Sequence, residues 1–115
     1  MSQLSDKLKS AGLTRVIADL PEWSELLDGD ALYVRELSAA ERGAYESELV
    51  SGEADFGTLR AKLVSDTLVN EDGDQVFDGP ADVADLSGSV VGRLSDLALE
   101  VSGLTEDAVD DAVKD

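Results

Sequence analysis

The stretch ALYVRELSAAER, residues 31–42, decides the fold, because a strand pattern changes into a helix pattern inside it. Its first seven residues, 31–37, are rich in β-formers and alternate in polarity, as half-buried strands do. Ser38 then offers a helix N-cap, and Glu41 three residues later completes the sequence signature of a capping box. We therefore predict a strand that leads directly into a helix over residues 39–50.

A second strand is predicted upstream of this junction. Residues 14–20 alternate apolar and polar side chains, and Pro21 ends the run. We expect this strand to pair with residues 31–37 as a β-hairpin whose connection is PEWSELLDGD, residues 21–30. A short opening helix is predicted before Gly12, because two leucines four residues apart precede this helix-stopping glycine.

The chain after the junction is predicted to be helical. Asp55 is an N-cap candidate for an amphipathic helix over 56–69, with Phe56 as the first member of its apolar stripe. The segment NEDGDQVFDGP, residues 70–80, has turn composition. A short helix over 80–86 is expected next, because proline suits the first helical turn.

The clearest helical period begins after Ser87, which is predicted to be its N-cap, and ends before Gly103. Leu99 lies on the opposite side of this helix from its apolar stripe, so we expect it to be exposed. Thr105 is predicted to cap a last acidic segment, and both termini, residues 1–12 and 105–115, are expected to be mobile. The stripe consists of Val90, Val91, Leu94, Leu97, Ala98 and Val101.

These elements predict one small α+β domain over residues 1–115. It is mostly α-helical, with four to five helices and an N-terminal β-hairpin. A chain of 115 residues suits a single core. The start MSQLSDKLKSAG has no apolar run of signal-peptide length, so we expect a cytoplasmic protein.

The net charge of the chain limits the classes of partner that are expected. The chain has 26 acidic and 9 basic residues, a formal net charge of −17 spread along its length. Nucleic acid and anionic membranes are therefore not expected as partners, because both require clustered Lys and Arg. Three interpretations of the acidity remain open: a partner with a basic surface, mimicry of nucleic acid, or a surface adapted to solubility in a salt-rich cytosol.

Catalytic chemistry is not predicted. The chain lacks histidine, the commonest general base, and cysteine, a common nucleophile and metal ligand. Asp72-Gly73 resembles part of a calcium-binding EF-hand loop, but the register puts Leu68 at the first ligand position and Gly79 where a bidentate Glu is needed. We expect a protein that is not an enzyme and has no metal or cofactor.

Four residues are candidates for a partner-binding surface. Leu99, Leu26 and Leu27 are apolar side chains at positions where exposure is expected. Arg60 lies on the apolar side of the 56–69 helix, where it either contacts a partner, pairs with a buried carboxylate, or packs its stem on the core with its head in water. Single exposed leucines are common on protein surfaces, so this surface is a hypothesis.

Three runs carry a resemblance to a known family. PEW (21–23), LYVRELSAAER (32–42) and LRAKLVSDTLVNEDGDQVF (59–77), in this order, resemble the tail assembly chaperones of long-tailed, siphovirus-type phages and prophages. The likeness covers residues 20–104. The SELLDGD stretch is longer than the family's usual hairpin connection, and both termini fit less well.

The resemblance implies a non-enzymatic role in phage tail assembly. Members of this family bind the tape-measure protein, keep it soluble and help to recruit tail-tube protein. The resemblance also implies association with itself and with a frameshifted, extended form, action in the host cytoplasm, and absence from the mature virion. The alternatives are an acidic DNA-mimic inhibitor of a host nucleic-acid-binding protein and a cellular adaptor.

Overall fold

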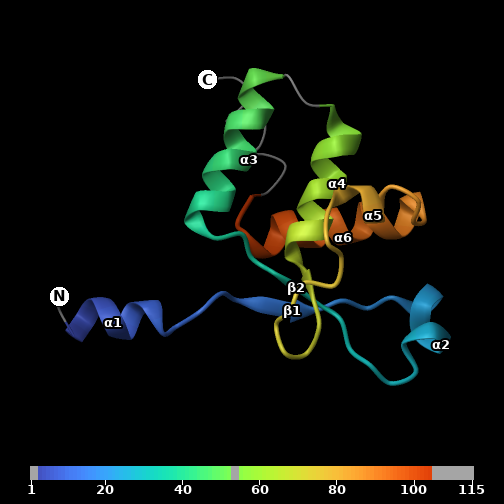
Figure 1. Ribbon diagram of the computed structural model, residues 1–115, viewed down its shortest axis with the longest axis horizontal. Coiled ribbons are helices and arrows are strands. Elements are labelled where there is room, and N and C mark those ends of the chain that lie inside the picture. The colour runs from blue at the N-terminus through green and yellow to red at the C-terminus, as the bar shows by residue number, and fades with distance from the viewer. Residues whose placement is uncertain (1–2, 53–54, 105–115) are drawn as a thin grey trace.

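The computed structural model describes residues 3–52 and 55–104, and its architecture is α+β and mostly helical (Figure 1). The predicted fold class is confirmed, although the described residues form six α-helices where four to five were predicted. The N-terminal half supplies most of a small sheet, and the later helices cover it. Within the described residues the elements are α1 (Gln3–Lys9), β1 (Arg15–Ile17), a 3-10 turn η1 (Pro21–Trp23), α2 (Ser24–Leu27), β2 (Tyr33–Arg35), α3 (Ala39–Ser51), α4 (Phe56–Thr67), β3 (Leu68–Val69), α5 (Pro80–Val83) and α6 (Gly88–Val101).

The sheet is antiparallel, with β2 between β1 and β3. The predicted hairpin is present, and its register pairs Val16 with Val34. On the other side, Val34 pairs with Leu68. Val34 and Leu68 are completely or almost completely buried, so this row of side chains forms the sheet's contribution to the core.

The third strand was not predicted, because the helix over 56–69 was expected to continue to its end. Helix α4 instead stops at Thr67, and Leu68 has extended backbone angles. The spacing from Val64 to Leu68 fits a helical stripe, but an extended Leu68 also reaches the core when it pairs with Val34. A pattern of buried positions cannot separate these two outcomes.

The connection between β1 and β2 is more ordered than predicted. It forms η1 and α2, and Pro21 stands in the first helical turn, where its fixed φ is suitable. Trp23 and Leu27, one helical turn apart, pack against the core. An ion pair between Glu22 and Arg93 ties this connection to α6.

The core lies between the sheet and helices α4, α5 and α6 (Figure 1). The predicted stripe of α6 is confirmed at its centre, because Val90, Leu94 and Ala98 are buried, and its other members are partly buried. Both predicted N-caps also form: the Asp55 side chain accepts from the Thr58 amide at 2.7 Å, and Ser87 accepts from Val90 at 3.5 Å.

A helical segment was predicted at each end of the chain. The predicted opening helix is confirmed as α1, which projects from the body as an arm (Figure 1). The segment that Thr105 was predicted to cap lies outside the described residues.

Candidate partner-binding surface

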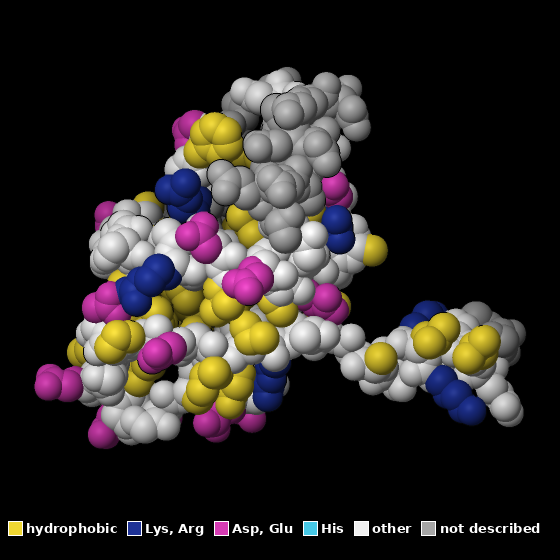
Figure 2. All heavy atoms as spheres, turned by 180° about the vertical axis from the view of Figure 1, so that it is seen from behind, with side chains coloured by type: hydrophobic (Ala, Val, Ile, Leu, Met, Phe, Trp, Pro, Cys, Tyr) yellow, Lys and Arg dark blue, Asp and Glu magenta, His cyan; other side chains and the backbone are white. Residues whose placement is uncertain are grey.

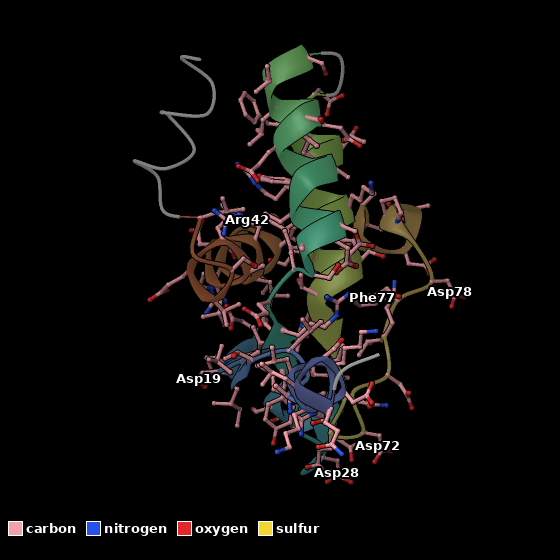
Figure 3. All side chains as sticks on the ribbon, turned by 90° about the vertical axis from the view of Figure 1, so that its left-hand side faces the viewer. Asp19, Asp28, Arg42, Asp72, Phe77 and Asp78 are labelled. Carbon is pink, nitrogen blue, oxygen red and sulfur yellow. The ribbon has the colours of Figure 1, made fainter. Side chains whose placement is uncertain are left out.

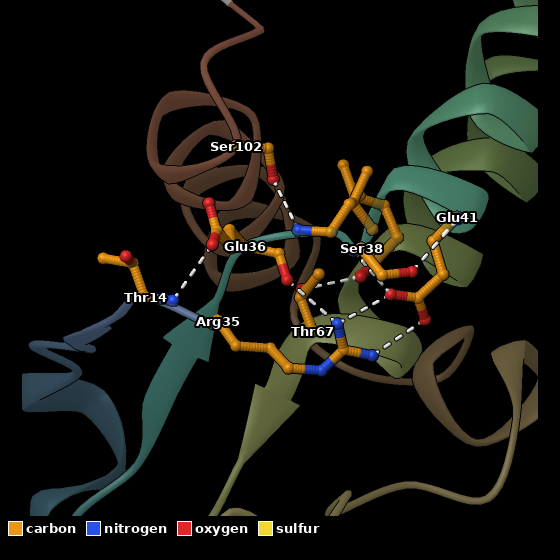
Figure 4. A network of polar contacts seen from close by, with 9 residues as sticks. Thr14, Arg35, Glu36, Ser38, Glu41, Thr67 and Ser102 are labelled. Carbon is orange, nitrogen blue, oxygen red and sulfur yellow. Dashed lines mark hydrogen bonds and ion pairs between the residues drawn. The ribbon is translucent and has the colours of Figure 1, made fainter. Parts of the chain in front are cut away.

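Helix α3 is fixed at its first turn by a compact polar network (Figure 4). The two terminal guanidinium nitrogens of Arg35 donate to the two carboxylate oxygens of Glu41, each at 2.8 Å. Glu41 also accepts from the Ser38 amide at 2.9 Å, while the Ser38 hydroxyl accepts from the Glu41 amide at 3.2 Å. The predicted capping box therefore forms, and the same carboxylate joins the end of β2 to the start of α3.

This network changes the acidity of Glu41. The hydrogen bond from Arg35 is the largest cause, and with the Ser38 amide it lowers the pKa of Glu41 from 4.5 to about 2, although partial burial opposes the shift. Glu41 is therefore ionised throughout the neutral and mildly acidic range. An ionised carboxylate in the first helical turn also interacts favourably with the helix dipole.

The base of α3 is also tied to the end of α6. The Leu37 amide donates to the Ser102 hydroxyl at 2.9 Å, and the Arg42 guanidinium donates to the Ser102 carbonyl at 3.3 Å. Figure 3 shows Arg42 extending from α3 towards α6. These contacts come from two elements, so they set the direction in which α3 leaves the body.

A cleft separates α3 from α4. Lys62 of α4 pairs with Glu48 of α3 across it at 3.5 Å, and the Tyr45 side chain is half-buried in it. Burial raises the pKa of Asp66 at its base, and the nearby Glu41 carboxylate adds to this shift. The hollow at this point has a volume of about 20 Å³, which is room for about one water molecule. It is far too small to hold a small-molecule ligand, because such pockets have volumes of about 300–1,000 Å³.

Beyond its base, α3 is largely exposed. Leu49 is its one buried residue. A shallow, open hollow runs along its outer side, lined by Gly43, Glu46, Ser47, Val50 and Ser51. At the far end of the α3–α4 hairpin, Val50 is 56% exposed and Phe56 is 71% exposed. We call the pair Val50 and Phe56 the hairpin tip.

Phe56 corrects one expectation from the sequence. It was assigned to the buried stripe of the 56–69 helix, but as the first residue of α4 it lies beyond the end of the core and faces solvent. Its position directly after the N-cap Asp55 places it in the first turn of the helix, and this was the signal that it could lie outside the core. Val50 stands in the last turn of α3, where the predicted helix was expected to end.

The four sequence-predicted residues do not form one surface. Leu26 is exposed on α2, as expected, at 83%. Leu27 and Leu99 are partly buried and pack against the core, so their predicted exposure is wrong.

Arg60 is exposed on α4 and forms no ion pair with any described residue. Of the three interpretations of Arg60, a buried pair with a carboxylate is therefore not met within residues 3–52 and 55–104, and the exposed side chain is compatible with the favoured one, a head group in water. Its charge opposes the effect of burial on Tyr45, whose pKa is raised, so Arg60 lies near the α3–α4 cleft. It remains a candidate contact for a partner.

Within the described residues, no group of three or more acidic side chains is arranged to hold a metal ion. No helix in the same part of the chain is both long and apolar enough to span a membrane. Comparisons of the chain with known protein families, with curated proteins and with solved structures find no match.

Proposed function

We propose that this protein is a non-enzymatic tail assembly chaperone of a long-tailed phage or prophage. In this proposal it binds the tape-measure protein in the host cytoplasm, keeps that protein soluble, and helps to recruit tail-tube protein. The observation that carries the proposal is the hairpin tip: two large apolar side chains stand exposed on a strongly acidic protein. An apolar contact site on a highly charged carrier suits the capture of an aggregation-prone helix.

The face shown in Figure 2 supports this interpretation more than mimicry of DNA. A mimic presents carboxylates in rows that copy the spacing of phosphates. On the face shown in Figure 2, acidic side chains are scattered singly among apolar and uncharged ones. Scattered carboxylates keep a complex soluble without specifying a nucleic-acid-binding partner.

The sequence runs that resemble the chaperone family have structural roles in the fold. VREL-S-AAE supplies Arg35, Ser38 and Glu41, which join β2 to α3. NEDGD forms a turn in which the Asn70 side-chain oxygen accepts from the Asp72 and Asp74 amides. The resemblance therefore bears on the framework that holds the α3–α4 hairpin, while Val50 and Phe56 of the tip lie outside the three resembling runs.

Co-expression with the tape-measure protein encoded in the same genome tests the proposal. The wild-type chain should make the tape-measure protein soluble and co-purify with it. A double variant, Val50→Asp with Phe56→Asp, should fold normally and lose this capture. Ala84→Asp is the control, because it adds a charge at an exposed position outside the tip.

Leu26→Asp tests the competing surface predicted from the sequence, since Leu26 lies on α2, far from the hairpin tip (Figure 1). If Leu26→Asp loses capture and the double tip variant keeps it, the binding surface lies on α2 and not at the hairpin tip. A tape-measure protein that stays insoluble with the wild-type chain would contradict the proposed function itself.

A further inference from the structure

Arg60 differs from the other basic residues of the body. Within residues 15–52 and 55–104, it is the one Lys or Arg whose side chain has neither an ion pair nor a hydrogen bond. Its guanidinium is exposed on α4, so its hydrogen-bond donors are available to a partner. The other cations of the same ranges all contact an acceptor: Arg15 the Asn70 and Glu71 carbonyls, Arg35 Glu41, Arg42 Glu46, Lys62 Glu48, and Arg93 Glu22.

Phe56 lies one helical turn before Arg60 and is the exposed aromatic residue of the chain. Its exposed fraction is 71%. Residues four apart lie on the same face of a helix, so the exposed ring and the unpaired cation are neighbours on α4. The other aromatic residues are partly buried: Trp23, Tyr33, Tyr45 and Phe77.

This pair lies near the end of the α3–α4 hairpin that points away from the sheet (Figure 1). Val50 of α3 is also exposed at that end. Burial raises the pKa of Tyr45 on α3, and the Arg60 charge opposes this rise, so Arg60 lies close to α3 as well. A partner bound at Phe56 and Arg60 would therefore be within reach of both helices.

The two side chains together indicate the chemistry of that partner. A Phe ring offers apolar contact area, and a guanidinium binds a carboxylate best, through two parallel hydrogen bonds. Aromatic residues and Arg are also enriched at the energetic centres of protein interfaces. A polyanion such as nucleic acid is repelled by a net charge of −17, whereas a single carboxylate beside an apolar side chain needs only one local cation.

We propose that Phe56 and Arg60 bind an amphipathic partner helix that places a carboxylate about one turn from an apolar side chain. The apolar side chain packs on Phe56, and the carboxylate pairs with Arg60. The rest of the acidic body repels a carboxylate, so this pair also fixes the orientation of the bound helix. The inference rests on the proposed function only where it assigns this helix to the tape-measure protein.

Two synthetic peptides of identical composition test the inference. Each has about 20 residues, long enough to be helical, and one leucine face. The first peptide carries Glu beside that face and Lys on the opposite side, and the second has these two residues exchanged. The wild-type protein should bind the first peptide about fivefold more tightly in an anisotropy titration, because the exchange replaces attraction to Arg60 by repulsion. Overall repulsion is the same for both, since their net charges are equal.

Variants of the full chain locate the preference. Arg60→Glu should reverse it, and Arg60→Lys should keep its direction at a smaller size, because lysine cannot pair through two parallel hydrogen bonds. Lys9→Glu is the matched control, since it makes the same charge change on the exposed α1 arm and should leave the preference unchanged. Phe56→Ala should weaken binding of both peptides by about tenfold. All these side chains are exposed, so the melting temperatures should stay near the wild-type value.

Equal binding of the two peptides by the wild-type protein, or tighter binding of the second, would overturn the inference. An Arg60→Glu variant that keeps the wild-type preference, or a wild-type chain that binds neither peptide, would also overturn it. Co-expression separates the inference from the proposed function. Tape-measure capture that survives Arg60→Glu contradicts this inference alone, whereas an insoluble tape-measure protein together with the expected peptide preference contradicts the proposed function alone.

Discussion

Helices α3 and α6 are nearly equal in length, 13 and 14 residues, but they are stabilised in different ways. Helix α6 buries four residues between the sheet and α4, including Leu94 at 2% exposure. Helix α3 buries Leu49 alone and is fixed mainly by polar contacts at its first turn. Most helical stability in proteins comes from packing an apolar face, so α6 is the ordinary case and α3 is the exception.

Under the proposed function, this difference separates the helix that folds the core from the helix that binds a partner. The apolar face of helix α6 is buried in the core. Helix α3 is held at its first turn, and its outer side and tip are exposed to solvent. A helix that is not needed to complete the core can present Val50 to a partner without loss of stability. The predictions below test this division.

The largest effect is expected in α6. Leu94→Ala should lower the free energy of unfolding by about 2–5 kcal/mol, because it leaves a cavity in a fully packed region. Val50→Ala, on the exposed part of α3, should change it by less than about 0.5 kcal/mol. Urea unfolding of both variants measures the contrast. Similar losses in the two variants would show that the tip of α3 is part of the folded core.

An intermediate effect is expected at the base of α3. Glu41→Gln removes the charged partner of Arg35 and should cost about 1–2 kcal/mol, reduced from the value for a buried pair because Glu41 is one third exposed. Ser38→Ala should cost about 0.5–2 kcal/mol through the lost cap. The double variant should lose less than the sum, since both residues belong to one network.

Thermal unfolding of the two single variants and the double variant checks this. If Glu41→Gln lowers the free energy of unfolding by less than about 0.5 kcal/mol, its effect is that of a typical surface substitution. It would show that the network does not hold α3 in place.

The smallest effects are expected in the dependence of stability on pH. The pKa of Glu41 is lowered from 4.5 to about 2, so its contribution is complete above pH 4.5 and is lost as the pH falls towards 2. Asp66 behaves oppositely, because burial raises its pKa: the charged form is disfavoured in the folded state at neutral pH. Asp66→Asn should therefore stabilise the protein at pH 7, and this gain should disappear as the pH falls through the raised pKa.

Unfolding free energies measured from pH 7 downwards for the wild type, Glu41→Gln and Asp66→Asn separate these two contributions. Glu41→Gln should converge on the wild type only below pH 4.5. An Asp66→Asn variant that is less stable than the wild type at pH 7 would show that the Asp66 carboxylate has a stabilising partner.

Local signals predicted most of the helical framework. The capping residues Ser38, Asp55 and Ser87 were read correctly, because an N-cap depends on two or three adjacent residues. The buried stripe of α6 was also predicted, since its period is regular. These features depend on spacing within one element, which the sequence contains in full.

Features that depend on two distant elements were missed. Strand β3 exists because Leu68 pairs with Val34, and nothing near Leu68 indicates that pairing. Leu99 was expected to be exposed, but it is partly buried against the core cluster, which residues from several elements form. The hairpin tip was missed for the same reason: the exposure of Phe56 is set by where the core ends, which only the assembled fold determines.

Amide hydrogen exchange of the free full chain tests the central contrast most directly. The central amides of α6, around Leu94, should exchange only through opening events close to global unfolding. The amides in the second half of α3, over residues 47–51, should exchange much faster through local opening, while those next to the capping box are intermediate. Equal protection of α3 and α6 would contradict the account, because it would show that α3 is as firmly packed as the core helix.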